Sequence, residues 1–412
     1  MQAPSFKTVL PYALVVFFGY VGFAMPLPML PEMFLDAHVG ILPTSFSSQL
    51  KTLLLGIVMS AYPLGQLIGA PILGKASDLF GRKRVILVSL LGSTLGYLFT
   101  AFSTNRSSIL GLFLGLFFCG LCEGNVAIAQ SVIADLSPPE HKDHKVSQFG
   151  WINIFICFAF IIGPILGGQL SGLFSFATPF WIAALMTVIG VAIILLFSKE
   201  TKKLEDRPLK ESYLASFRKS LQQKSLCRAY LVNFFLALGY FSYFRFLPVY
   251  IESTFNLGTT MLGYIIAYGS VIFALFSFFF LKPLSKRFST PRLLTFFAAS
   301  LALTFLVVLG PNSPWGLLWT IPLVDLCIAV VMTHGTLLVS DASDERFQGQ
   351  AFGLLTSVQV LAEIFTGLGG GCFAAYHPSL PMIIGACMLL VSSLILLASK
   401  KKEKHPHSFL KK

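Results

Sequence analysis

Five ionisable side chains stand inside long apolar runs of this sequence: Glu123, Arg245, Asp325, His334 and Glu363. A charged group in hydrocarbon is costly, so each is a candidate for a function. A carboxylate screened from water can bind and release protons near neutral pH, whereas an arginine stays charged. We therefore expect Asp325, Glu363 or Glu123 to carry a proton, and Arg245 to neutralise an acid or to hold an anionic part of a substrate. The alternatives are a static buried ion pair and a structural His334.

The composition indicates that these side chains lie in a membrane. The chain has 412 residues, of which 55% are hydrophobic, and only 30 Lys and Arg and 18 Asp and Glu. A soluble chain of this length would carry roughly 100 charged residues. The net charge of +12 would suit a nucleic-acid binder, but the basic residues lie in short clusters between apolar runs. That pattern is typical of a membrane protein, and it excludes a soluble enzyme, a disordered chain and a nucleic-acid binder.

Apolar runs long enough to cross a bilayer, about 20 residues each, recur along the chain. We identify twelve, near 8–34, 50–74, 83–103, 108–134, 147–173, 178–198, 228–251, 259–281, 291–309, 315–340, 349–374 and 380–399. The sequence therefore predicts an all-α membrane protein with twelve transmembrane helices in two pseudo-symmetric six-helix bundles.

The orientation follows from the basic residues. With the N-terminus inside, all Lys and Arg residues except Lys51, Arg106 and Arg245 fall in cytoplasmic segments. Lys and Arg are enriched on the cytoplasmic side of membrane proteins. We expect both termini to be cytoplasmic and the protein to reside in the plasma membrane, the inner membrane of a bacterium.

The chain divides into two similar halves. The predicted parts are residues 1–198, a polar cytoplasmic linker 199–227, residues 228–399 and a cytoplasmic tail 400–412. The pairs Phe149-Gly150 and Gly167-Gly168 recur as Phe352-Gly353 and Gly370-Gly371, at a spacing close to half the chain. Such repeats are typical of transporters whose substrate site lies near the middle of the membrane between the halves.

The segment after the second run combines glycines, a carboxylate and a basic triplet: Gly74-Lys75-Ala76-Ser77-Asp78-Leu79-Phe80-Gly81-Arg82-Lys83-Arg84. The two glycines allow the backbone to reverse sharply, and Asp78 can lie at the N-terminus of a neighbouring helix. Arginines here can pair with carboxylates or with lipid phosphates. Positive-inside charge alone would explain the arginines but not the glycine spacing around Asp78.

This segment closely resembles the signature loop of the major facilitator superfamily, G-x-x-x-D-R-x-G-R-R/K, with Leu79 in place of the usual arginine. The resemblance implies a cytoplasmic gate that locks the halves together. By resemblance, the gate residues are Gly74, Asp78, Gly81, Arg82 and Arg84, with Asp135 at the end of the fourth helix as their acidic partner. The second-half counterpart, ending in Phe288, has Lys286 where Asp78 stands.

The fifth run resembles the antiporter motif of the drug/proton exporters in that superfamily, a group that includes the tetracycline/proton antiporters. The residues that carry this resemblance are Gly150, Gly163, Pro164, Gly167 and Gly168, with Ala159 replacing one glycine. Small residues at this spacing let helices approach closely, and such packing is the alternative interpretation. Leu116 replaces an arginine of helix four that is implicated in proton transfer in those exporters.

We expect a secondary active transporter that works by alternating access and exports a small amphipathic compound in exchange for protons. The alternative is an importer of a metabolite or a metal chelate such as a siderophore on the same fold. A membrane sensor or assembly factor and a membrane enzyme are less favoured. The expected partners are a small-molecule substrate, protons and the lipid bilayer. We expect a monomer without a cofactor, a bound metal or a nucleic acid.

Overall fold

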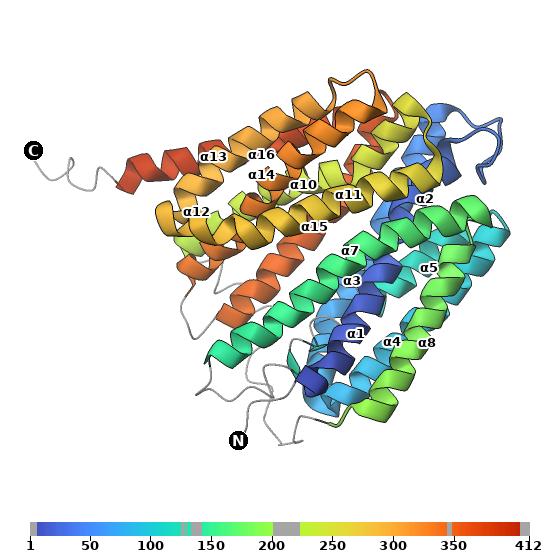
Figure 1. Ribbon diagram of the computed structural model, residues 1–412, viewed down its shortest axis with the longest axis horizontal. Helices are drawn as coiled ribbons and strands as arrows, with labels where there is room; N and C mark the ends of the chain where they lie inside the picture. The colour runs from blue at the N-terminus through green and yellow to red at the C-terminus, as the bar shows by residue number, and fades with distance from the viewer. Residues whose placement is uncertain are drawn as a thin grey trace, which may run out of the picture. The chain divides into compact units, whose positions relative to one another are not determined.

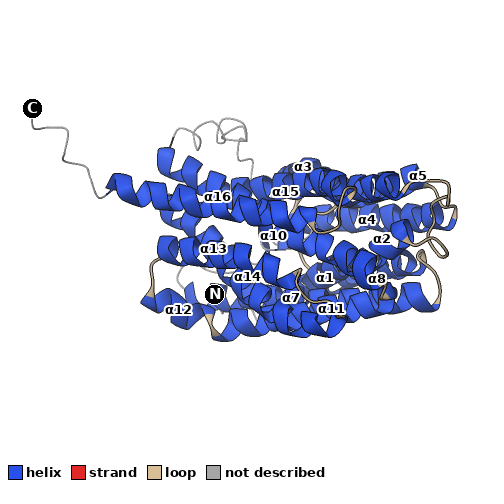
Figure 2. Ribbon diagram, turned by 90° about the horizontal axis from the view of Figure 1, so that it is seen from above, coloured by secondary structure: helices blue, strands red, loops and turns tan. Residues whose placement is uncertain are grey.

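Long apolar runs fold as helices in hydrocarbon because a helix satisfies its own backbone hydrogen bonds. The computed structural model describes residues 6–124, 128–129, 131–132, 142–200, 223–343 and 348–403. These residues are largely helical, and no strand occurs among them (Figures 1 and 2). The prediction of an all-helical membrane protein is confirmed.

Fourteen helices are described. From the N-terminus to residue 200 they are α1 (Phe6–Ala24), α2 (Pro26–Leu35), α3 (Ser48–Phe80), α4 (Arg82–Asn105), α5 (Ile109–Leu121), α7 (Lys142–Leu173) and α8 (Thr178–Phe197). From residue 223 onward they are α10 (Lys224–Phe255), α11 (Gly258–Phe279), α12 (Leu281–Arg287), α13 (Thr290–Val308), α14 (Pro314–Ala342), α15 (Gln348–Ala374) and α16 (Leu380–Glu403). In the described part of the chain, 11 helical runs are long and apolar enough to cross a membrane, with α1 and α2 counted together.

The fourth predicted run is the exception. Its helix α5 ends at Leu121, and the backbone of Glu123 and Gly124 is not helical. Gly120 precedes this break and Gly124 lies in it, and glycine weakens a helix because it loses more conformational freedom than other residues. Irregular backbone is tolerated at membrane depth only where protein or a water-filled cavity surrounds it. Glu123, which lies in this break, is therefore expected to be surrounded by protein or by a water-filled cavity.

The chain folds into two compact units. Unit 1 comprises residues 1–207 together with 251–271, and unit 2 comprises residues 208–250 together with 272–412. In unit 1, α1 packs against α7 and α8, α4 against α8, and α5 against α3 and α4. In unit 2, α13 packs against α14 and α16, and α15 contacts the same two helices. The bounds of these units differ from those of the two predicted halves. The division into halves that move against each other in transport therefore stays a prediction.

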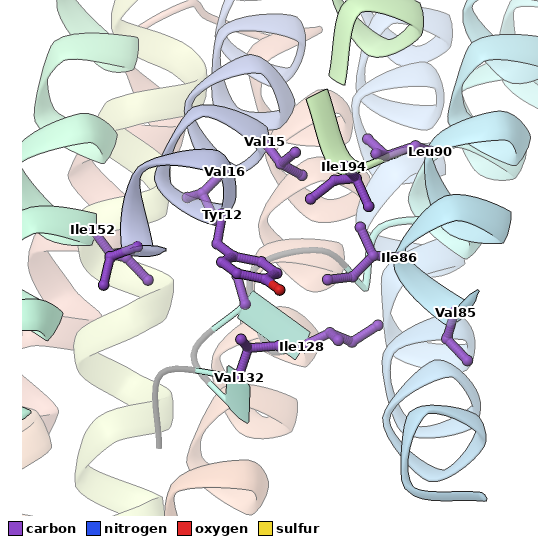
Figure 3. Packing of buried hydrophobic residues seen from close by; sticks show 12 residues of the cluster. Tyr12, Val15, Val16, Val85, Ile86, Leu90, Ile128, Val132, Ile152 and Ile194 are labelled. Carbon is purple, nitrogen blue, oxygen red and sulfur yellow. The ribbon is translucent and has the colours of Figure 1, made fainter. Parts of the chain in front are cut away.

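One apolar cluster of unit 1 joins helices that are far apart in the sequence (Figure 3). Tyr12 and Val16 of α1 meet Ile86 and Leu90 of α4 and Ile194 of α8, all of them buried. Between membrane helices, such side chains stabilise the contact through van der Waals packing. This cluster holds the beginnings of α1 and α4 next to the end of α8.

Glycines bring α3 and α5 into backbone contact. A Cβ at Gly65 or Gly69 would overlap the backbone of α5 at Phe117 and Leu121, and a Cβ at Gly120 would overlap the carbonyl of Tyr62. Small residues at membrane helix interfaces permit such close approach. The end of α5, and with it the position of Glu123, is therefore fixed against α3.

Candidate functional site

The reversal between α3 and α4 takes place at one residue. Helix α3 continues through Phe80, and Gly81 has φ +96° and ψ +149°. This backbone region is essentially open to glycine alone. Gly74, by contrast, lies inside α3 with no other atom within 4 Å of a Cβ added there. The sharp turn expected from two glycines therefore depends on Gly81 only.

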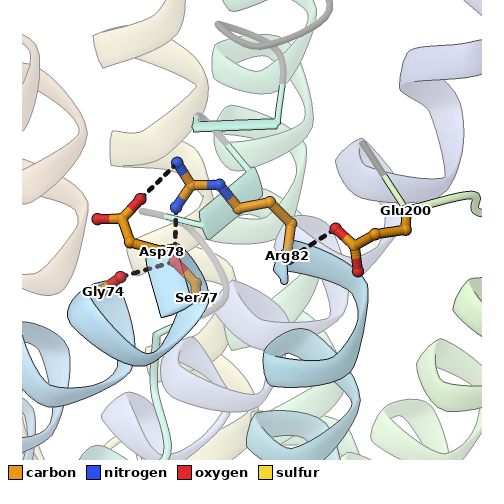
Figure 4. Close-up of polar contacts among 5 residues, drawn as sticks. All are labelled: Gly74, Ser77, Asp78, Arg82 and Glu200. Atoms are coloured by element: carbon orange, nitrogen blue, oxygen red, sulfur yellow. Dashed lines mark hydrogen bonds and ion pairs between the residues drawn. The ribbon is translucent and has the colours of Figure 1, made fainter. Parts of the chain in front are cut away.

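The side chain of Arg82 closes this turn (Figure 4). One guanidinium nitrogen lies 3.0 Å from Asp78 Oδ1, and the other donates a hydrogen bond of 2.6 Å to Ser77 Oγ. Ser77 in turn donates to the carbonyl of Gly74 at 2.7 Å. The Arg82 side chain is only 10% exposed, whereas that of Asp78 is 51% exposed. The arginine is thus held in a fixed position and the aspartate stays accessible to water.

Glu200 also contacts this turn, and the sequence did not single it out. Its Oε1 accepts a hydrogen bond from the backbone N–H of Arg82 at 2.8 Å, and its Oε2 accepts one from that of Lys83 at 3.1 Å. It therefore caps the N-terminus of α4, where the helix dipole favours an anion. The carboxylate on the first two N–H groups of α4 is thus that of Glu200 and not that of Asp78. The available signal was the position of Glu200, the first acid after the sixth apolar run.

Two further residues belong to the predicted gate. Arg84 lies exposed on the first turn of α4. Asp135, the predicted acidic partner, lies outside the described residues, so its role stays a prediction.

We expect Gly81→Ala to lower the free energy of unfolding by about 1–3 kcal/mol, because alanine is strained at this φ and ψ. The added Cβ would also lie 2.6 Å from Glu200 Oε2. Gly74→Ala is the matched control, because it lies in a helix with open space around it and should stabilise the protein by roughly 0.5–1 kcal/mol. Thermal unfolding of both variants in detergent checks this difference. Equal stability of the two would contradict the geometry.

The antiporter-like motif brings α7 into contact with two other segments of unit 1. A Cβ at Gly167 would overlap the carbonyl of Met25, which lies between α1 and α2. One at Gly163 would lie 2.8 Å from the Cβ of Ala24, the last residue of α1. On the other side, a Cβ at Gly168 would lie 2.5 Å from the carbonyl of Thr259. The remaining motif residues, Gly150 and Pro164, also lie within α7. The glycines therefore serve close packing, whatever else the motif does.

Gly167→Ala should reduce the amount of folded protein, because overpacking against rigid backbone costs about 1–3 kcal/mol. Gly190→Ala in α8 is the matched control, since the nearest atoms that a Cβ there would meet are side-chain atoms of Leu90 and Phe18, at 3.5 Å and beyond. Size-exclusion chromatography of both variants measures the folded fraction. A normal Gly167→Ala profile would contradict the tight contact.

Glu123 lies in the break after α5 and is buried. The hydroxyl of Tyr62, on α3, forms a hydrogen bond with its carboxylate. A Cβ at Gly19 of α1 would lie 2.9 Å from Glu123 Oε1. Tyr97 of α4 is buried close by, and its hydroxyl has no hydrogen-bond partner among the described residues. Leu116, where the exporters have an arginine, is buried about two turns earlier.

In unit 2, Arg245 of α10 and Glu363 of α15 form a hydrogen-bonded ion pair. Both side chains are 7% exposed. Each buried charge stabilises the other, because either one alone would carry a large, uncompensated desolvation penalty. The sequence left open whether Arg245 neutralises an acid or holds a substrate anion, and the structure brings it to Glu363.

Asp325 has a different environment. It lies on α14 and is 2% exposed, and its Oδ2 has no hydrogen-bond partner among the described residues. Tyr243 of α10 lies near it and stacks on Phe305, with ring centroids 5.6 Å apart. An unsatisfied buried carboxylate is costly when ionised, and protonation removes most of that cost. The structure of the described residues therefore favours the neutral acid form of Asp325.

Both ring nitrogens of His334 are occupied. Nδ1 lies 2.9 Å from the carbonyl of Val330, and Nε2 lies 2.9 Å from Ser285 Oγ of α12. Because a carbonyl only accepts, Nδ1 carries a hydrogen. His334 follows Asp325 by nine residues, about 14 Å along the helix. It links α14 to α12 and does not join the Asp325 site.

Comparison with known proteins agrees with these features. The family model for the Major Facilitator Superfamily matches residues 12–367. The tetracycline resistance protein, class B, of Escherichia coli is 30% identical over 367 residues, covering 82% of this chain and 85% of that protein. The quinolone resistance protein NorA of Staphylococcus aureus is 23% identical over 397 residues, covering 94% of this chain and 95% of that protein.

A solved structure supports the same fold. The human organic anion transporter MFSD10 (TETRAN) superimposes with a TM-score of 0.70 at 21% identity, covering 96% of this chain and 100% of the other. The matched family model spans most of the chain, and these relatives are transporters. The chain therefore belongs to the Major Facilitator Superfamily and is an integral membrane transporter of small molecules.

Proposed function

We propose that this protein exports a small amphipathic compound in exchange for protons, and that Asp325 carries the proton. The observation that supports this most is the buried Asp325 carboxylate, with an oxygen that has no hydrogen-bond partner in the described chain. The relatives of this chain include tetracycline and quinolone resistance proteins. Drugs of these two kinds are therefore the first substrates to test.

Proton coupling requires that two conformations bind the proton with different affinity. Asp325 in its dry environment favours the neutral acid, because ionisation there leaves a charge without compensation. A conformation that opens this side chain to water on the cytoplasmic side would favour the carboxylate. The proton would then enter from the outside and leave to the cytoplasm, while the substrate moves in the opposite direction.

The Arg245–Glu363 pair serves a different role in this proposal. Because the two charges already satisfy each other, neither is available as a proton carrier in the conformation described. We assign the pair the task of holding α10 and α15 in register. His334, with both ring nitrogens bonded, is likewise a structural residue in this conformation.

Glu123 is the second candidate for proton transfer, in unit 1. Its hydrogen bond from Tyr62 stabilises the carboxylate, in contrast to the unpaired oxygen of Asp325. We therefore rank it after Asp325. The gate residues Asp78, Arg82 and Glu200 would lock the cytoplasmic side in one of the two conformations, with both termini on that side.

Fluorescence quenching in everted vesicles from a bacterial host tests this function. Respiration acidifies the vesicle lumen, and a pH-sensitive dye reports the gradient. Addition of a transported tetracycline or fluoroquinolone should partly collapse the gradient in vesicles that contain the protein and not in vesicles from the empty host. If no compound of either kind changes the gradient while intact cells take up one of them, the protein is an importer.

A further inference from the structure

The short helix α12 carries a concentration of positive charge. Four basic residues of this region are exposed: Lys282, Lys286, Arg287 and Arg292. The segment 279–292 contains no Asp or Glu. None of the four basic side chains forms an ion pair with an acid of the described residues. One described acid contacts this region: Asp341 accepts a hydrogen bond of 3.3 Å from Thr290 Oγ1.

The corresponding segment of the first half is arranged differently. There, Arg82 pairs with Asp78, and Glu200 accepts hydrogen bonds from the first two N–H groups of α4. The second-half segment has Lys286 where Asp78 stands. It has therefore kept its cations and lost the carboxylate that faces them in the first half. A basic cluster without internal partners is poised to take an external anion.

Apolar rings border the same cluster. Phe278, Phe279 and Phe280 are 80%, 60% and 53% exposed, and Phe288 is 50% exposed. The candidate spans on either side are Gly258–Phe279 and Thr290–Val308, so α12 lies where the chain leaves and re-enters the membrane. Exposed rings of this size call for apolar cover. A ligand that matches both the basic side chains and the apolar rings must itself be amphipathic.

We propose that this surface, the α12 patch, binds an anionic phospholipid. The patch consists of the four basic residues and the four phenylalanines named above. The headgroup phosphate would lie against the basic side chains, where Arg287 and Arg292 can each donate two hydrogen bonds, and the acyl chains would cover the rings. The phosphate thus supplies the negative charge that Asp78 supplies in the first half. A free phosphate would leave the rings uncovered, so the lipid is the favoured source.

Lipid binding to the purified full-length protein tests this proposal. The protein is titrated with phosphatidylglycerol or phosphatidylcholine, and bound lipid is counted by native mass spectrometry. The variant Lys282→Gln/Lys286→Gln/Arg287→Gln/Arg292→Gln should lose the preference for phosphatidylglycerol by about tenfold or more. The tail variant Lys400→Gln/Lys401→Gln/Lys402→Gln/Lys404→Gln removes the same charge and should keep the preference. An unchanged preference in the first variant, or an equal loss in the tail variant, overturns the proposal.

A single substitution gives a second test that does not depend on the fourfold variant being folded. Lys286→Asp restores the acid of the first-half segment and adds a negative charge to the patch. It should reduce phosphatidylglycerol binding more than Lys286→Gln does, while phosphatidylcholine binding stays the same. Equal binding by both variants contradicts the proposal. Because neither test measures transport, their outcome is independent of whether the protein exports drugs.

Discussion

Replacement of Asp325 by asparagine is expected to abolish substrate-driven proton movement while the amount of folded protein stays the same. Asparagine has nearly the same shape but cannot bind and release a proton. Because the carboxylate has a buried oxygen without a partner, its removal should not lower the free energy of unfolding. Dye quenching in everted vesicles measures the proton movement, and size-exclusion chromatography measures the folded fraction.

Glu123→Gln is the matched comparison, because it neutralises a buried acid in unit 1 instead of unit 2. We expect it to leave proton movement largely in place and to weaken the contact with Tyr62. If Glu123→Gln abolishes proton movement and Asp325→Asn does not, the proton carrier is in the break after α5 and our assignment is wrong.

Loss of either partner of the Arg245–Glu363 pair should strongly reduce the amount of folded protein. An uncompensated buried charge costs about 3–5 kcal/mol when its partner is removed. Both Arg245→Gln and Glu363→Gln should therefore unfold at lower temperature than the parent protein. Thermal unfolding in detergent, followed by size-exclusion chromatography, gives the comparison.

The double variant Arg245→Gln/Glu363→Gln separates a structural pair from a functional one. It removes both charges and should recover most of the stability lost by the single variants, because no unpaired charge remains. If the pair only positions α10 and α15, proton movement should return with the stability. A stable double variant without proton movement would show that one of the two charges takes part in transport.

Much of the fold could be predicted from the sequence, because hydrocarbon leaves a long apolar run little choice other than a helix. The break in the fourth run could not. Residues 108–134 are apolar enough to span, and nothing in their hydropathy marks Glu123 as non-helical. Gly65, Gly69 and Gly120 bring α3 and α5 into backbone contact up to Leu121, where the helix ends, and hydropathy does not reveal this contact between distant segments.

The candidate site was predictable only as a set of residues. Buried charges are rare, so Asp325, Arg245 and Glu363 stood out by type alone. Which of them meet could not be derived, because Arg245 and Glu363 are 118 residues apart and no local pattern links them. Glu200 was missed for the same reason, since it reaches the start of α4 across 118 residues.

Transport into proteoliposomes with an imposed pH gradient tests proton-coupled export through Asp325 most directly. With purified protein and a drug identified in the vesicle assay, the drug should accumulate when the lumen is acidic and should not accumulate when it is alkaline. A protonophore should abolish the accumulation, and Asp325→Asn should show none with either gradient. Accumulation with an alkaline lumen, or undiminished accumulation in Asp325→Asn, would contradict the mechanism proposed for this transporter.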